Sequence, residues 1–103
     1  MSKVVMVATF TCADGKNDEM DEVLSKQVAV VSELDGVEAY SYHRGEGNKY
    51  AFFAIFSSPE AIQAQGEAPA LQEIMPAFME LLEGPPQMNM YSAVSSFGLP
   101  QLD

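Results

Sequence analysis

The chain has 103 residues, a length that supports one domain. Apolar residues make up 48% of the sequence, which is enough for a packed core and excludes global disorder. The 15 acidic and 5 basic residues give a formal charge of −10, and such a surface repels phosphate backbones and anionic membranes. We therefore expect no nucleic-acid partner and no membrane partner.

Four apolar or β-branched stretches predict the strands of a sheet. Short stretches of this kind bounded by turn residues are typical of strands, and an unbroken apolar run indicates burial on both faces. In the second stretch Tyr40 and Tyr42 share one face, while His43 lies on the other. The expected strands are residues 4–11, 37–44, 49–57 and 88–94.

The segments between these strands predict helices, because apolar side chains recur there at helical spacing. Gly36 suits the left-handed cap that ends the first helix. Ser57 or Ser58 is expected to cap the second helix, which has Pro59 at its first position. Pro76 lies inside the third helix, where the missing N–H is expected to kink or split it. The expected helices are residues 18–34, 59–66 and 71–82.

The order β-α-β-β-α-β is the ferredoxin-like arrangement, a split β-α-β sandwich with helices on one face of one sheet. We expect an α+β fold with a single domain at 1–95 and a C-terminal tail at 96–103. The first and third strands are apolar on both faces, so the sheet face without helices needs a cover. The simplest cover is a second copy, which predicts a homodimer through sheet-to-sheet packing, with the tail against the partner sheet.

Two features bear on location and cofactors. The N-terminus lacks the apolar core of a signal peptide, and no apolar run approaches the roughly 20 residues of a membrane span. With one cysteine, Cys12, no internal disulfide can form, and we expect a cytoplasmic protein. One histidine and one cysteine also disfavour a metal site, so we expect no metal.

Three segments resemble the antibiotic biosynthesis monooxygenase family, whose members are dimeric α+β barrel proteins. The segments are the first strand followed by Asp14-Gly15-Lys16, then Leu34-Asp35-Gly36-Val37 leading into Tyr40, and finally Ser57-Ser58-Pro59-Glu60-Ala61. The resemblance covers residues 4–94. It implies an oxygenase that acts on an aromatic polyketide or quinol without metal or flavin.

The sequence departs from this family at several polar positions. The family often has a Glu and a Trp on the third strand, where this chain has Ala54 and Phe56, and a His where this chain has Gln65. Haem-degrading members rely on a tryptophan and a histidine on the helices. This chain has no tryptophan and a single histidine on a strand, so haem degradation is disfavoured.

Oxygenation without a cofactor needs an apolar cavity that binds a flat aromatic molecule and shields its anion from water. Imidazole is the one side-chain type that titrates near neutral pH, which makes His43 the candidate base. Arg44 is expected to pair with a nearby acid. The expected substrate-binding residues are Tyr40, Tyr42, Phe52, Phe56, Gln65, Met75, Phe78 and Tyr91, which alternatively serve core packing alone.

The leading hypothesis is a cofactor-independent monooxygenase that binds a small hydrophobic aromatic molecule of the quinol or anthrone type. Two alternatives remain open on the same fold. One is a non-catalytic dimeric module that binds a small ligand, and the other is an isomerase or cyclase. Consumption of dioxygen separates the leading hypothesis from both alternatives.

Overall fold

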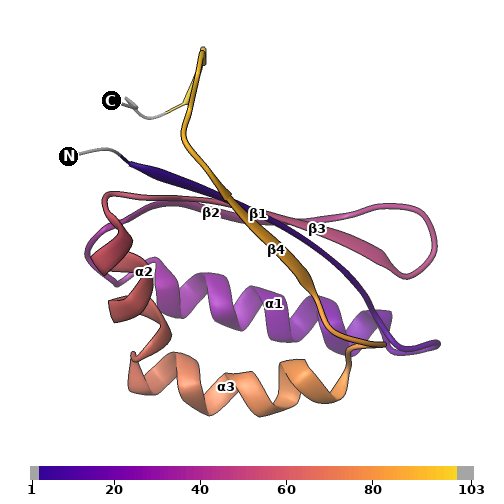
Figure 1. The fold of residues 1–103 in the computed structure, drawn as a ribbon. Helices are drawn as coiled ribbons and strands as arrows, with labels where there is room; N and C mark the ends of the chain where they lie inside the picture. The colour runs from indigo at the N-terminus through magenta and orange to yellow at the C-terminus, as the bar shows by residue number, and fades with distance from the viewer. Residues whose placement is uncertain (1–2, 100–103) are drawn as a thin grey trace.

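The computed structural model describes residues 3–99 and has two layers, with helices on one face of a single sheet (Figure 1). This arrangement confirms the expected α+β, ferredoxin-like fold, including the two helices expected between the third and fourth strands. The strands are β1 (Val4–Thr11), β2 (Val37–Arg44), β3 (Lys49–Phe56) and β4 (Gln87–Tyr91), and the helices are α1 (Asn17–Val31), α2 (Pro59–Gly66) and α3 (Pro69–Glu80).

The sheet is antiparallel and its strand order is β2-β3-β1-β4. The central strands β1 and β3 pair over their full length, from Val4 opposite Phe56 to Thr11 opposite Lys49. These two strands are also the most apolar, because central strands lose contact with water along both edges. The edge positions go to the more polar β2 and to β4.

The core lies between the sheet and the helices. Side chains alternate across a strand, so the even-numbered residues of β1 and β3 face the helices. Among them Phe56 is completely buried, as is Met20 on α1. Burial of the first strand on both faces was expected, but Val5 and Val7 are only half-buried because no helix covers their side of the sheet.

The connections between α1 and β2 and between β3 and α2 meet at one end of the sheet. Gly36 has a φ of +87°, which confirms its left-handed conformation, but it does not cap α1, because that helix ends at Val31 with Ser32 as its C-cap. A Cβ atom at Gly36 would lie 2.7 Å from the Cβ of Ala61, so the close approach of α2 also requires glycine. Ser58 caps α2, and its hydroxyl accepts a hydrogen bond from the Ala61 N–H at 3.2 Å.

The C-terminal half of the chain differs from expectation at Pro76 and at the end of the last strand. Pro76 does not split α3, because it lies on an exposed side of the helix while Leu71 and Phe78 hold the segments before and after it against the core. The last strand ends at Tyr91, the final residue paired with β1, and residue Val94 is fully exposed. The predicted tail lies partly outside the described residues, at 100–103. Across residues 3–99, no helix combines the length and hydropathy needed to cross a bilayer.

Candidate functional site

A cavity of about 430 Å³ lies between the sheet and the helices. Its walls are mainly apolar and aromatic, and the volume falls within the range of small-molecule sites. Six residues predicted from the sequence line it, namely Tyr40, Tyr42, Phe52, Gln65, Met75 and Phe78. Further lining residues include Met6, Ala8, Phe10, Gln27, Ile62 and Met88.

Two predicted substrate-binding residues do not line this cavity. Phe56 faces the helices but is completely buried in the core. Tyr91 is opposite Val5 in the pairing of β4 with β1, which places it on the sheet face without helices. The structure therefore brings together six of the eight predicted residues.

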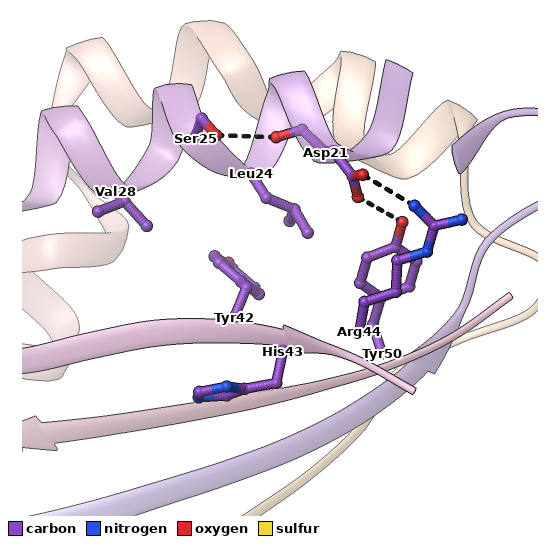
Figure 2. Close-up of a pocket in the computed structure, with 8 residues that line it drawn as sticks. All are labelled: Asp21, Leu24, Ser25, Val28, Tyr42, His43, Arg44 and Tyr50. Atoms are coloured by element: carbon purple, nitrogen blue, oxygen red, sulfur yellow. Dashed lines mark hydrogen bonds and ion pairs between the residues drawn. The ribbon is translucent and has the colours of Figure 1, made fainter. Parts of the chain in front are cut away.

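The candidate base His43 is also separated from the cavity. Figure 2 shows Tyr42 pointing from β2 toward α1, and the neighbouring His43 pointing away on the other side of the strand. His43 is exposed, and its Nε2 atom lies 2.9 Å from the hydroxyl of Ser41 on the same face. The sheet thus lies between the imidazole and this cavity, and His43 instead lines a separate hollow, of which Tyr42 is the one predicted substrate-binding residue.

Hydrogen-bonded polar side chains form part of the cavity wall. The Tyr42 hydroxyl donates to the Oε1 atom of Gln27, which projects from the buried face of α1. The hydroxyl oxygens of Tyr40 and Tyr42 lie 3.4 Å apart, a long contact for two hydroxyl groups. The Nε2 atom of Gln27 lies 3.7 Å from the sulfur of Met75 on α3. These contacts connect α1, α3 and β2 around one side of the cavity.

Both tyrosines of this wall stay protonated at neutral pH. Burial raises the pKa of Tyr42 far above its ordinary value, and the neighbouring Tyr40 adds to the rise. Burial also raises the pKa of Tyr40, although its hydrogen bond with Tyr42 opposes this shift. The cavity residues in the described chain include no carboxylate and no imidazole. The wall therefore offers neutral hydrogen-bonding groups and no strong base.

A second hollow, of about 400 Å³, opens between α1 and the β2 edge, and Tyr42 lines both spaces (Figure 2). The expected ion pair of Arg44 forms here, with its Nη1 atom 3.0 Å from the Oδ2 atom of Asp21. The Tyr50 hydroxyl donates to the Oδ1 atom of Asp21 at 2.6 Å. Because these polar groups satisfy one another, the cluster is a structural link between α1 and the sheet.

The remaining candidates for chemistry have no suitable surroundings. Cys12 is buried, and burial raises the pKa of its thiol, so it is a poor nucleophile. Within residues 3–99, no three His, Cys, Asp or Glu side chains converge as metal ligands would.

Gln27 is a cavity residue that was not predicted, although its position in the sequence is unusual for a polar residue. It follows Met20 and Leu24 and precedes Val31 on the buried stripe of α1, where only apolar side chains are expected. It is 1% exposed, and among the buried residues of the described chain it is the only one with an amide or charged side chain. A polar residue within an apolar helical stripe is thus the pattern that would have identified it.

The sequence also matches a family model, which is described as antibiotic biosynthesis monooxygenase and covers residues 3–77. The chain belongs to this family. The matched residues include five of the six predicted residues that line the cavity, and Phe78 follows them directly. No curated protein shows a significant match to the sequence of this antibiotic biosynthesis monooxygenase family member.

Solved structures similar to this family member share its fold at low sequence identity. A protein from Caulobacter crescentus described as belonging to the same class is 21% identical, with a TM-score of 0.85 over 91% of this chain and 92% of its own. SnoaB, a cofactor-independent oxygenase from Streptomyces nogalater, is 18% identical, with a TM-score of 0.83 over 95% and 99% of the two chains. A conserved protein from Methanosarcina mazei is 15% identical, with a TM-score of 0.82 over 88% and 92%.

Proposed function

We propose that this chain is a cofactor-independent monooxygenase that oxidises a small hydrophobic aromatic molecule of the quinol or anthrone type. The observation that carries the proposal is the apolar cavity of about 430 Å³ with neutral hydroxyl groups in one wall. A flat aromatic ring suits the apolar walls, and Tyr40 and Tyr42 suit an oxygen atom on that ring. Family membership and the shared fold with SnoaB support the reaction class.

The proposed reaction balances without a redox partner other than dioxygen. An electron-rich ring carbon passes electrons to dioxygen and forms a carbon–oxygen bond, giving a hydroperoxide. Cleavage of the oxygen–oxygen bond then leaves one oxygen atom in the product as a carbonyl and releases the other as water. Water takes both hydrogens that the substrate loses. No protein side chain has to retain a proton, which is compatible with a cavity that holds no strong base.

Three side chains of the cavity wall position the substrate in this proposal. Tyr40 and Tyr42 orient the substrate oxygen, and Phe52 packs against the ring that carries it. The aromatic contacts already present between these three side chains, with ring centroids 4.7–5.7 Å apart, hold them in place. His43 has no role in this proposal, because it does not line the cavity of about 430 Å³ and its side chain points to the other side of β2 from Tyr42 (Figure 2).

The test is dioxygen uptake by metal-free protein with a panel of quinols and anthrones, combined with ¹⁸O₂ labelling. We expect uptake above the spontaneous rate and one labelled oxygen atom per product. Tyr40→Phe removes a hydroxyl from the cavity wall and is expected to lower kcat/KM about tenfold, the effect of one hydrogen bond to a substrate. Tyr91→Phe removes a hydroxyl outside the cavity and serves as the matched control.

A second candidate function is a ligand-binding module without turnover, favoured by the lack of a base among the described cavity residues. It predicts ligand binding in the cavity with no dioxygen uptake. If dioxygen uptake equals the spontaneous rate for every compound and binding is nevertheless saturable, the ligand-binding module is the correct function and the monooxygenase is not. Product formation without dioxygen uptake would instead indicate the isomerase or cyclase.

We also propose that two copies pack through the sheet faces that carry no helices. Val5, Val7, Ala51 and Phe53 form a half-buried apolar surface there, and a second copy would remove it from water. Phe53→Asp places a charge on this surface and is expected to convert a dimer into a monomer in light scattering after gel filtration. Ala29→Asp, at an exposed position on α1, is the control. A wild-type monomer would refute this assembly.

A further inference from the structure

The orientation of one buried amide fixes the hydrogen-bonding character of the cavity wall. Gln27 lies between two partners, the sulfur of Met75 at 3.7 Å from its Nε2 atom and the hydroxyl of Tyr42 at its Oε1 atom. A thioether sulfur has no hydrogen and can only accept a hydrogen bond. The NH₂ group must therefore face Met75, which leaves the carbonyl oxygen of the amide to face Tyr42.

This orientation of the amide engages the single hydrogen of the Tyr42 hydroxyl in a hydrogen bond to Gln27. An amide oxygen can only accept, so Tyr42 must donate to Gln27. The lone pairs of the Tyr42 oxygen are then its only remaining hydrogen-bonding capacity. Toward any other group, including a ligand in the cavity, Tyr42 is an acceptor.

The hydroxyl hydrogen of Tyr40, unlike that of Tyr42, is not held by a close acceptor. Its hydroxyl oxygen lies 3.4 Å from that of Tyr42, and its hydrogen is the only one available for that long contact. A closer acceptor would attract this hydrogen away from Tyr42. The two neighbouring hydroxyls therefore offer a fixed acceptor, Tyr42, and an adjustable donor, Tyr40.

We propose that Gln27, by fixing Tyr42 as an acceptor, makes the cavity select aromatic ligands that carry a hydroxyl group over those in which an ether oxygen takes its place. A ligand hydroxyl can donate to Tyr42 and accept from Tyr40 at once, whereas an ether oxygen can only accept. This inference deepens the proposed function and rests on it for the aromatic nature of the ligand. Gln27 is a specificity-determining residue that acts through Tyr42.

The other polar groups at the cavity do not remove this preference. Burial holds both tyrosine hydroxyls in the protonated form, so ionisation at neutral pH does not change their roles. Gln65 also lines the cavity, but its amide offers both a donor and an acceptor and therefore selects neither type of ligand.

The test measures binding of 1-naphthol and 1-methoxynaphthalene by calorimetry under nitrogen, so that no turnover contributes. We expect the wild type to favour 1-naphthol about tenfold, the usual effect of one buried hydrogen bond. In Gln27→Leu the Tyr42 hydrogen is released and the preference is expected to fall to about twofold or less. Gln63→Leu, at an exposed glutamine on α2, is expected to keep the wild-type preference.

Tyr42→Phe provides a second variant that keeps the ring and removes the acceptor, in case Gln27→Leu does not fold. It is expected to lose the preference for 1-naphthol while retaining binding of 1-methoxynaphthalene. Equal wild-type affinities, failure of the wild type to bind either compound, or an undiminished preference in Tyr42→Phe would each overturn the inference. A protein that shows the preference but no dioxygen uptake would retain this inference and lose the monooxygenase assignment.

Discussion

Ala8→Phe is expected to block ligand binding without unfolding the protein. Ala8 is 5% exposed, lies on the central strand β1, and its side chain lines the cavity of about 430 Å³. A phenyl ring at this position would occupy the space in which an aromatic ligand must lie. We expect affinity for 1-naphthol to fall by at least about 100-fold, equivalent to about 2.7 kcal/mol.

The stability of this variant distinguishes filling of the cavity from damage to the core. In a filled core, an added ring costs about 1–3 kcal/mol because neighbouring side chains must move. In a cavity, the ring instead buries apolar surface at little strain, so we expect the free energy of unfolding to stay within about 1 kcal/mol of wild type. Ala29→Phe, on the exposed side of α1, is the control for binding. Unchanged affinity in Ala8→Phe would show that ligands bind elsewhere.

Phe56→Ala is expected to have the largest effect on stability. Phe56 is completely buried on β3 and faces the helices without lining the cavity. Removing a buried phenyl ring costs about 3–5 kcal/mol, because its transfer energy is lost and a void remains. Small domains have about 5–15 kcal/mol in total, so this variant loses much of its stability.

Urea unfolding measures this loss as a shift of the transition midpoint at unchanged slope. Phe56→Leu keeps most of the buried volume and is expected to lose clearly less than Phe56→Ala, which gives a graded comparison at one position. A loss below about 1 kcal/mol in Phe56→Ala would contradict the core position of this side chain.

Local chemistry explains why most of the fold was predictable. The apolar runs of β1 and β3, the Ser58 cap and the left-handed Gly36 each act within a few residues of their own position. The continuity of α3 through Pro76 instead depends on tertiary contacts. A proline inside an isolated helix is costly, but contacts of Leu71 and Phe78 with the core hold α3 together.

The site was less predictable, and His43 shows why. From the sequence alone, the alternation of side chains along β2 places His43 on one face of the strand and Tyr40 and Tyr42 on the other. It does not reveal which face the helices cover, because the central strands β1 and β3 are apolar on both faces. The packing of α1 and α3 decided that question, and the cavity formed on the tyrosine side.

The sequence by itself determined the order of the elements, the α+β class, the acidic surface and the family, because these depend on composition, periodicity and short motifs. The tertiary structure alone decided the pairing of Gln27 with Met75, which are 48 positions apart in the sequence, and hence the orientation of the amide beside Tyr42. Such contacts depend on how α1 and α3 pack against each other and the sheet. The hydrogen-bonding character of the cavity follows from that packing and from no local pattern.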